Sequence, residues 1–343
     1  MNDATGMPPR RGPAASRRGL LRLSAAMAAL AATHAPAVRA QAFPTPGRPV
    51  RLLLPSGAGG GADLFGRLMA EWLSKELGTQ VVVDNRPGAN GLLATQEVAR
   101  AAPDGHTLLI SFTAATVANK LLMLKPPVDP LNDVVPIARI GGGGGNMIVV
   151  NPSLPVRSLK ELVEYAKTRT DLTYASWGIG SGGHLVMESI KAKSGLRIEH
   201  VPYKTVAQIP PDLISGVIPV ATIDAATPMP HIRSGRMRPI ATMSSERLPQ
   251  LKDVPTMIEQ GFPLEAIPWY GLFGPKGLPR EIVERLNAAL NRWMVMPEVV
   301  EFFEQKQNSP PPKPLSVAAF EKQIQDELVR WKALIDVAGV KPE

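Results

Sequence analysis

The sequence predicts an α/β protein with two lobes, each built on a doubly wound sheet, with crossover strands between the lobes and an interlobe cleft. Three observations favour this fold. Short runs of Val, Leu and Ile alternate with amphipathic helical stretches, the runs lack the polar alternation of a half-exposed strand, and the whole pattern restarts after a cluster of glycines. Strands of this kind are typical of sheets covered on both faces, so we expect parallel sheets with helices on each side.

The first forty residues predict a twin-arginine signal peptide. The segment from Ser16 to Arg22 contains the arginine pair, an apolar stretch follows from Leu23 to Thr33, and Val38-Arg39-Ala40 has the small residues that a signal peptidase prefers. We expect cleavage after Ala40 and export to the periplasm by the twin-arginine route. The stretch is shorter than the roughly 20 residues of a membrane span, so we expect no stable membrane insertion. The alternative is a disordered basic tail.

Composition narrows the function classes. Loss of residues 1–40 removes six arginines and one aspartate, which lowers the formal net charge from +8 to +3. Since no later basic run interleaves with aromatic residues, we expect no nucleic-acid partner. The chain has no cysteine, which excludes disulfides, thiol nucleophiles and thiolate metal sites. The mature chain is long enough for two domains.

The elements of the first lobe follow in order from these patterns. Strands are predicted at 50–54, 81–83 and 107–112, and helices at 61–77, 91–101 and 114–122. A proline-bounded loop covers 126–136. The apolar runs at 137–140 and 147–150 flank five glycines, Gly141 to Gly145. We expect the chain to cross between lobes there, with the glycines as a loose hinge, or alternatively as a surface loop.

The second lobe repeats the plan. Its predicted helices cover 158–168, 182–194, 205–215 and 228–234, and its strands cover 172–176, 198–201, 217–223 and 239–243. A strand at 267–273 should return to the first sheet, and helices at 279–295, 297–306 and 316–337 should pack on domain one. We therefore expect domain one at 44–144 plus 266–343, and domain two at 145–265.

Glycine loops connect a strand to a helix in each lobe. Gly57 to Gly61 does so in the first lobe, and Trp177 to His184 does so in the second. The free N–H groups and the dipole at a helix start favour an anion, and glycine lets the anion approach the backbone. Because ligands of doubly wound sheets bind at the carboxyl ends of the strands, the two loops should face each other across the cleft. A ligand with a carboxylate at each end would satisfy both.

Several stretches resemble the Bug family of periplasmic receptors of tripartite tricarboxylate transporters. They occur in the family's order along nearly all of the mature chain: Arg48 to Leu52, Pro55 to Asp63, Asp84 to Ala89, Ala102 to Leu108, Val149 to Pro155, His200 to Lys204, Pro230 to Gly235 and Asp253 to Thr256. The resemblance implies a type II periplasmic binding protein fold that closes on small carboxylates. It also implies membrane transporter subunits as partners.

The resemblance places the two carboxylate-binding elements at Ala58-Gly59-Gly60 and at Gly180-Ser181-x-x-His184. Side-chain candidates are the polar residues that follow strands on the expected cleft side. The predicted substrate-binding residues are Ser56, Gly57, Ala58, Gly59, Gly60, Thr113, Trp177, Gly180, Ser181, Gly182, His184 and Asp224.

Each of these polar side chains also has a structural interpretation. Ser56 and Thr113 are equally explained as turn residues or caps, and Ser181 can cap its own helix and still donate to a ligand. Asp224 alternatively orders the loop before Thr227-Pro228. His184 is better explained as a cap or packing residue than as a base. Asp63, outside the predicted site, is better explained as a partner of the helix dipole than as a ligand contact.

The chain departs from the family pattern in ways that bear on specificity. Ser181 stands where many relatives have Thr, Trp177 stands where they have a small residue, and Lys204-Thr205 replaces the usual Lys-Gly. One hypothesis is that Trp177 stacks on the bound acid or shortens the pocket, which favours an aromatic or compact carboxylate. The alternative is an indole packed on the lobe surface.

A dinucleotide-dependent oxidoreductase is the alternative of a different class. Gly57-x-Gly59-x-x-Ala62 has the spacing of a dinucleotide-binding loop, and Asp84 ends the second strand, where a ribose-binding acid would lie. Against it, the second lobe has its own anion loop and no His, Lys or Tyr is placed for hydride chemistry. The first loop lacks a Walker Lys-Ser/Thr, and Ile179 replaces the glycine of a nucleophile elbow at Ser181.

The sequence thus predicts a solute-binding protein rather than an enzyme. The histidines beyond residue 40 are scattered and offer no zinc pair, so we expect no metal, no cofactor and no catalytic residue. The expected partners are a small organic carboxylate and the membrane subunits of a tripartite tricarboxylate transporter, with the receptor as a monomer. A purely structural or adhesive role is a third alternative.

Overall fold

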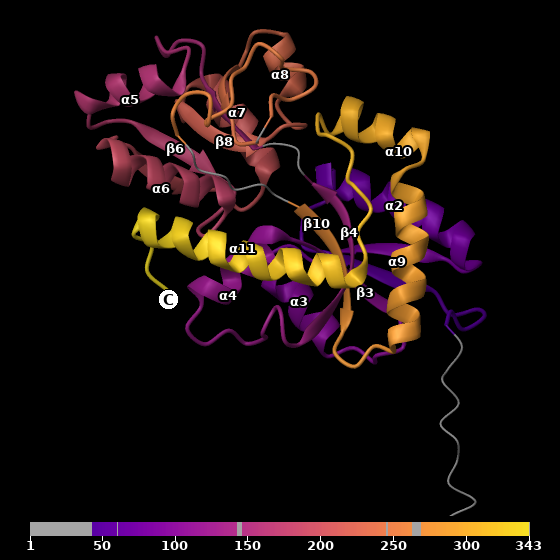
Figure 1. Cartoon of the computed structure of the whole chain (residues 1–343). Helices are drawn as coiled ribbons and strands as arrows, with labels where there is room; N and C mark the ends of the chain where they lie inside the picture. The colour runs from indigo at the N-terminus through magenta and orange to yellow at the C-terminus, as the bar shows by residue number, and fades with distance from the viewer. Residues whose placement is uncertain (1–42, 60, 143–145, 245, 263–268, 343) are drawn as a thin grey trace, which may run out of the picture. The chain divides into compact units, whose positions relative to one another are not determined.

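A computed structural model describes residues 43–59, 61–142, 146–244, 246–262 and 269–342 (Figure 1). The chain from Phe43 onward forms one compact unit. The predicted signal peptide and its cleavage after Ala40 lie outside the described residues. Within the described ranges, two sheets of five strands each form the framework of this unit, and each sheet has helices packed on it.

The first sheet has the strand order β2-β1-β3-β10-β4. In that order its strands are β2 (Val81–Asn85), β1 (Val50–Leu54), β3 (Thr107–Phe112), β10 (Trp269–Pro275) and β4 (Val134–Gly142). Strand β1 pairs in parallel with β2 and β3, and β10 pairs antiparallel with β3 and β4. The predicted return of a late strand to the first sheet is therefore confirmed.

The second sheet has the strand order β7-β6-β8-β5-β9. In that order its strands are β7 (Glu199–Pro202), β6 (Thr173–Ser176), β8 (Val220–Asp224), β5 (Asn146–Val150) and β9 (Arg238–Thr242). Strand β6 pairs in parallel with β7 and β8, whereas β5 pairs antiparallel with β8 and β9.

The expectation of purely parallel sheets was wrong, because both sheets are mixed. In each sheet, the antiparallel strand is the first one that the chain forms after it has crossed from the other sheet. Strand β5 comes directly from β4 of the first sheet, and β10 is the strand that returns to the first sheet. A strand that arrives from the other sheet has no crossover helix to reverse its direction, so it inserts antiparallel to its neighbours.

Each sheet is buried on both faces, as its strands predict. Along β1, Val50, Leu52 and Leu54 join one apolar cluster and Leu53 joins another. Along β5, Ile148 and Val150 alternate in the same way with Met147 and Val149. Because successive side chains of a strand point to opposite faces, these runs need a helix layer on each side.

Helices of the first sheet's region come mostly from the two ends of the chain. They are α2 (Gly61–Leu77), η1 (Ala89–Gly91), α3 (Leu92–Ala99), η2 (Ala114–Ala118), α4 (Asn119–Leu122), α9 (Arg280–Met294), α10 (Pro297–Glu301), η4 (Phe302–Lys306) and α11 (Val317–Ala338). Helix α2 agrees with its predicted bounds because a glycine loop precedes it and Gly78, in the left-handed conformation, follows it.

The described helices of the second sheet's region are α5 (Leu159–Lys167), α6 (Gly182–Ser194), η3 (Val206–Gln208), α7 (Ile209–Ser215) and α8 (Met229–Arg233). The longest of them, α6, is shorter than α2, α9 and α11. The hydroxyl of Ser158 accepts the Glu161 N–H and begins α5, and Gly195 in the left-handed conformation ends α6. These are the caps that the sequence signals favour.

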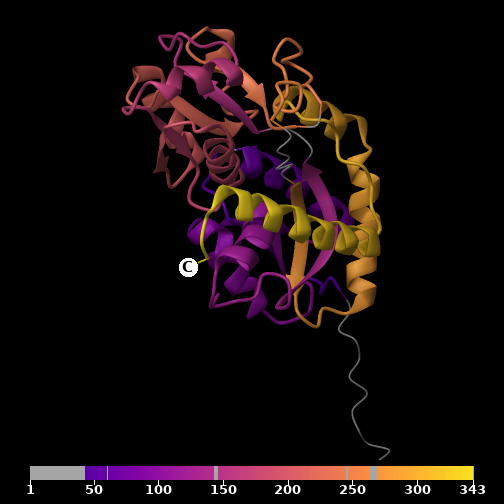
Figure 2. The same ribbon diagram turned by 60° about the vertical axis from the view of Figure 1, so that its left-hand side comes forward.

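Helix α11 packs on elements of both sheets, whereas only the first was expected. Its N-terminal part places Phe320 edge-on against Trp269 of β10, with ring centroids 5.3 Å apart. Near its other end, Ser189 of α6 donates a hydrogen bond to the Leu334 carbonyl. In Figures 1 and 2, α11 runs from beside β10 toward α6. One apolar cluster accordingly continues from the first sheet through α11 to the second.

The chain crosses between the sheets where predicted, between β4 and β5. Gly141 and Gly142 belong to β4, paired with Tyr270 and Trp269 of β10. A Cβ at Gly141 would lie 3.2 Å from the Tyr270 ring, so this glycine permits close packing. Gly143 to Gly145 lie outside the described residues. The hinge and the exact domain boundaries stay predictions.

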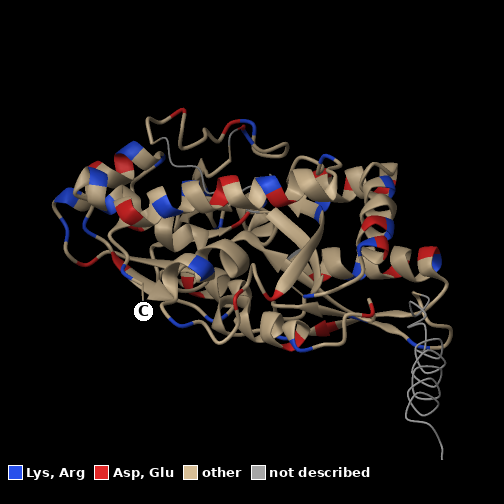
Figure 3. Ribbon diagram, turned by 60° about the horizontal axis from the view of Figure 1, so that its bottom comes forward, with Lys and Arg blue, Asp and Glu red and all other residues tan. Residues whose placement is uncertain are grey.

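Charged residues of both signs alternate along the outer helices (Figure 3). Many form pairs one helical turn apart, such as Lys322 with Asp326 and Lys332 with Asp336 on α11. Such exposed pairs contribute only about 0.3–0.5 kcal/mol each. Within the described ranges, no helix combines the length and the apolar character that crossing a membrane requires.

Candidate functional site

The first glycine loop follows β1 and is held by the carboxylate of Asp63. This side chain lies in the first turn of α2, 3% exposed, and accepts hydrogen bonds from the Gly59 N–H (2.9 Å), Arg67 Nε (3.0 Å) and Asn85 Nδ2 (3.0 Å). Burial alone would raise the pKa of Asp63, but these donors outweigh it and hold the pKa below its usual value. The structure thus supports the interpretation of Asp63 as a structural residue at the helix start.

The remaining donors of this loop are the ones open to a ligand. The Gly59 N–H is taken by Asp63, and Gly59 adopts φ +83°, which explains the glycine by backbone conformation. The hydroxyl oxygen of Ser56 is buried and has no hydrogen-bond partner among the described residues. A buried polar atom without a partner is uncommon and is often satisfied by a bound molecule. Gly57 is half-buried and Ala58 is exposed, while Gly60 lies outside the described residues.

The second glycine loop leads from β6 into α6 and is held by neutral groups. Ser181 is fully buried and caps α6: its Oγ accepts the His184 N–H at 3.3 Å and donates to Ser176 Oγ at 3.2 Å. The predicted cap is confirmed. Since the hydroxyl has a single proton, which Ser176 receives, none is left in this arrangement for a ligand.

His184 is buried and forms part of the loop's support. Its Nδ1 accepts the Gly180 N–H at 3.2 Å, so in the neutral ring the proton resides on Nε2. The structure gives Nε2 no hydrogen-bond partner among the described residues, and Nε2 is therefore a donor available to an anion. Burial lowers the pKa of His184, and nearby Lys191 adds to the shift while Glu188 opposes it.

The amides of Gly182 and Gly183 begin α6 and have no acceptor within the helix. Gly183 is required for packing, because a Cβ there would lie 2.2 Å from Thr222 Oγ1 and 3.1 Å from Trp177 Cη2. The half-buried indole of Trp177 therefore covers the start of α6. This contact supports the packing alternative for Trp177. It also leaves part of the side chain accessible.

Both loops lie at the seam between the two sheets. A Cβ at Gly57 would be 3.9 Å from Thr205 Cγ2, which follows β7 of the second sheet. Gly180, with φ +75°, is similarly close to the first sheet's helices: its Cβ would be 3.0 Å from Leu122 Cδ1 and 3.8 Å from Asn90 Nδ2. Each loop thus approaches an element that follows a strand of the other sheet.

Thr113 and Asp224 have structural roles that the sequence offered as alternatives. The buried Thr113 hydroxyl accepts the Trp269 N–H at 2.9 Å and fixes the end of β3 to the start of β10. Asp224 Oδ1 accepts the N–H groups of Ala226 (2.9 Å) and Thr227 (2.8 Å), which orders the loop before α8. A ligand role for either residue stays a prediction, and these bonds argue against a direct one.

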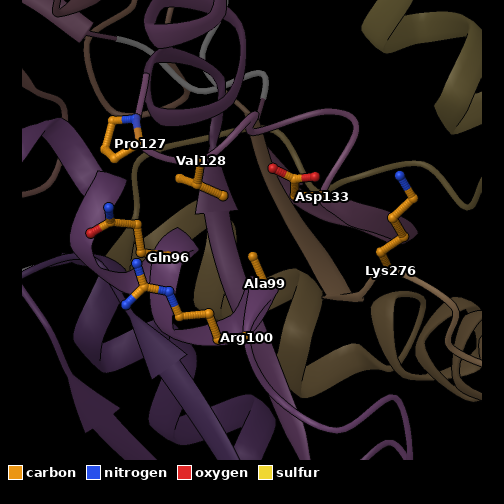
Figure 4. A pocket seen from close by; sticks show the side chains of 7 residues that line it. All are labelled: Gln96, Ala99, Arg100, Pro127, Val128, Asp133 and Lys276. Carbon is orange, nitrogen blue, oxygen red and sulfur yellow. The ribbon is translucent and has the colours of Figure 1, made fainter. Parts of the chain in front are cut away.

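Two surface hollows lie elsewhere. One, of about 180 Å³, is lined by Gln96, Ala99, Arg100, Pro127, Val128, Asp133 and Lys276 (Figure 4). The other, of about 650 Å³, is lined by Val201, Pro202, Tyr203, Lys204, Ala207, Gln208, Pro211 and Asp212. Neither is lined by a predicted site residue. The second is nevertheless adjacent in sequence to Thr205, which approaches the first glycine loop.

Asp84 is not placed as a ribose-binding acid. Its carboxylate forms ion pairs with Arg51 (2.6 Å) and Arg86 (3.2 Å), and Arg51 also contacts Glu97. These contacts connect β1, β2 and α3, so the acid that completed the dinucleotide-binding spacing serves the first sheet instead.

Three supporting residues were not singled out as site residues by the sequence. Asn85 donates to both Asp63 and the Ser56 carbonyl, and Ser176 and His200 form a bonded pair at 2.7 Å beneath the second loop. Ser176 ends β6 directly before the second loop, and Asn85 ends β2, the neighbour of the strand that precedes the first loop. A polar residue at such a strand end is a sequence signal that could have identified both. His200 is 24 positions from Ser176, and only the pairing of β6 with β7 brings the two together.

Comparison with known proteins gives a consistent result. The family model described as "Tripartite tricarboxylate transporter family receptor" matches residues 65–340. The chain is 34% identical to the protein BugT of Bordetella pertussis, across 94% of this chain and 99% of BugT.

Solved structures agree with these matches. Rpa4515 of R. palustris, determined with adipate, has a TM-score of 0.81 at 32% identity, covering 87% of this chain and 99% of that one. MatC of Rhodopseudomonas palustris, with bound malate, has a TM-score of 0.77 at 29% identity, covering 85% and 100%. The periplasmic binding protein BugD has a TM-score of 0.79 at 30% identity, covering 87% and 100%.

These similarities confirm the predicted two-sheet periplasmic binding protein fold and the Bug resemblance. They also rule out the alternative of a dinucleotide-dependent oxidoreductase. The chain belongs to the family of tripartite tricarboxylate transporter receptors.

Proposed function

We propose that this protein is a periplasmic receptor that captures a small organic carboxylate between the two glycine loops and delivers it to a transporter. The observation that carries the proposal is the position of both loops at the seam between the sheets, each close to an element of the opposite sheet. The buried, unpartnered hydroxyl of Ser56 in the first loop supports it. Two similar structures contain adipate and malate, and both of these ligands are dicarboxylates.

The proposed donors are distributed over both loops. Ser56 Oγ and the Gly57 and Ala58 amides serve from the first loop, and the Gly182 and Gly183 amides with His184 Nε2 serve from the second. A hydrogen bond to a charged group contributes about 1.5–3 kcal/mol. Two or three such bonds from each loop are enough for micromolar affinity, about −8 kcal/mol. No step of this function requires chemistry on the ligand, so we propose a receptor and not an enzyme.

The proposed cellular setting rests on the predicted signal peptide and on the family. We propose export by the twin-arginine route, cleavage after Ala40, and docking of the monomeric closed form on the membrane subunits of a tripartite tricarboxylate transporter. Mass spectrometry of the exported protein tests the cleavage site, and light scattering of the purified receptor tests the monomeric state.

A thermal-shift screen tests the function itself. Because a ligand that binds the folded state raises its stability, the panel should contain mono-, di- and tricarboxylates, amino acids and aromatic acids. We expect at least one carboxylate to raise the Tm, while its methyl ester does not. A panel in which no acid raises the Tm, with calorimetry showing no heat of binding, contradicts the proposal and favours a structural role.

Gly57→Ala gives a matched control on the site. Among the described residues its Cβ would meet Thr205 Cγ2 alone, at 3.9 Å, so we expect the fold to be unaffected. The added methyl group nevertheless lies where the anion approaches the backbone. We expect an unchanged Tm without ligand and weaker binding of the acid found in the screen. Unchanged binding would remove the first loop from the site.

A further inference from the structure

His200 lies beneath the second glycine loop, in a group of stacked rings. Its ring is 4.2 Å from the His184 ring and 4.9 Å from the Tyr174 ring, measured between centroids. Its Nε2 is 2.7 Å from Ser176 Oγ. Ser176 is fully buried at the end of β6 and joins His200 to Ser181, the cap of the loop.

The bonds of Ser176 fix which partner donates. A hydroxyl has one proton and two lone pairs. The lone pairs are taken by the Gly178 N–H and the Ser181 hydroxyl, both at 3.2 Å. A protonated His200 Nε2 would need a third lone pair. Nε2 is therefore an acceptor, and at 2.7 Å it is closer to Ser176 Oγ than the alternative acceptor, the Gly178 carbonyl at 3.1 Å.

The hydroxyls consequently form a directed chain. The His184 N–H donates to Ser181, Ser181 donates to Ser176, and Ser176 donates to His200. The chain turns the Ser181 oxygen toward the first turn of α6 and anchors Gly178 at the same point. It therefore fixes the segment from which the Gly182 and Gly183 amides emerge.

We propose that His200 is a positioning residue for carboxylate binding: as an acceptor for Ser176, it orients the hydroxyl chain that holds the second anion loop. The inference rests on the proposed function, because it concerns how one half of that site is held. His200 does not touch the ligand. It acts through Ser176 and Ser181.

The charges around His200 agree with an unprotonated ring. Burial and the neighbouring His184 lower the pKa of His200 to about 4; Lys191 acts in the same direction and Glu188 against it. The other titratable group that faces it is Tyr174, whose hydroxyl donates to Glu188 at 2.7 Å. Glu188 is in turn paired with Lys191 at 2.8 Å, so its charge is largely engaged.

Two substitutions separate the effect of the hydrogen-bond acceptor at Nε2 of His200 from the effect of its ring. His200→Gln keeps an acceptor at the reach of Nε2 and loses the stacked ring, whereas His200→Phe keeps the ring and loses the acceptor. With malate, adipate and benzoate as probes, we expect the Gln variant to bind within about twofold of the wild type. We expect the Phe variant to bind about three- to tenfold more weakly, the effect of one lost hydrogen bond.

The outcomes are distinguishable. Wild-type protein that binds none of these probes, nor any acid of the thermal-shift panel, overturns the proposed function and this inference with it. Wild-type binding together with a Phe variant that binds normally, or a Gln variant that binds worse than Phe, overturns the inference alone and leaves packing as the role of His200.

A pH series gives a second readout that does not depend on the Phe variant folding. From pH 7 to pH 4, the affinity of the wild type should fall relative to that of His200→Gln, because protonated Nε2 can no longer accept from Ser176. The ratio of the two affinities cancels the titration of the ligand's own carboxyl groups. A ratio that is flat over this range contradicts the inference.

Discussion

The two glycine loops have the same place in their sheets but are held in different ways. The first loop is organised by a buried carboxylate, Asp63, with a cation and two neutral donors around it. The second is organised by a neutral chain of Ser181, Ser176 and His200. A donor-rich loop can thus be fixed by charge or by hydroxyl orientation, and loops held in these two ways should respond differently to pH.

The largest effect should come from Gly183, because the second loop has no room at the helix start. A Cβ there would lie 2.2 Å from Thr222 Oγ1 and 2.7 Å from Thr222 Cβ, and this fully buried side chain is held by its hydrogen bond to the Ala175 carbonyl. Gly183→Ala should lower the free energy of unfolding by about 3 kcal/mol, the upper range of overpacking. Urea unfolding of the variant and the wild type measures this loss. Gly57→Ala in the first loop is the matched control, and equal losses in the two variants would contradict the difference between the loops.

Acidification should weaken the second loop's support before the first. The pKa of His200 is lowered to about 4 in the fold, so the unfolded chain binds the extra proton first and stability falls as the pH drops from about 6.5 to 4. The expected loss is on the order of 3 kcal/mol. His200→Gln should remove this part of the pH profile. A wild-type profile that is flat between pH 6.5 and 4.5 would contradict the assignment.

The first loop should respond only at lower pH. Since the pKa of Asp63 is lowered in the fold, its contribution is fully present above the unfolded value of 3.8 and is lost as the pH falls through the lower folded value. Asp63→Asn at neutral pH should cost about 2 kcal/mol, because the amide replaces a charged acceptor of three hydrogen bonds. Chemical unfolding of the variant at pH 7 checks this, with Glu71→Gln on the exposed face of α2 as control. A loss no larger than the control's would mean that Asp63 does not organise the loop.

The smallest expected effect concerns the choice of ligand. Trp177 is a feature of the second loop alone, half-buried over Gly183. If part of the indole meets the ligand, Trp177→Ala should change the order in which aromatic and aliphatic acids bind, by a few fold each. Calorimetry over the same acids measures that order. An unchanged order would leave Trp177 as a packing residue only.

Much of the local structure could be predicted because its causes are local. The Ser181 cap, the helix starting at Gly61 and the dipole role of Asp63 all depend on residues a few positions apart. The crossing between β4 and β5 was visible as a composition change. What the sequence did not reveal depends on pairing across the sheet: the antiparallel insertion of β5, the contact of Gly183 with Thr222, and the bond between Ser176 and His200.

The reasons for the loop glycines also depend on three-dimensional contacts that the sequence does not reveal. Each was predicted to be needed for the approach of an anion. At Gly59 and Gly180 a positive φ requires glycine, and at Gly183 close packing does. Gly57 has neither constraint: its φ is outside the left-handed region, and the contact described for a Cβ there is an ordinary one, 3.9 Å from Thr205 Cγ2. The backbone conformation and packing of the described residues do not require a glycine at position 57, so we explain Gly57 by the approach of a ligand.

The most direct test of the account is a crystal structure of the mature protein with the acid that gives the largest thermal shift. We predict a carboxylate within hydrogen-bond distance of Ser56 Oγ or the Gly57 amide, and contacts from the Gly182 and Gly183 amides to the same ligand. A ligand bound elsewhere, for example in the hollow lined by Tyr203 and Lys204, with both glycine loops making no contact to it, would contradict the proposed site.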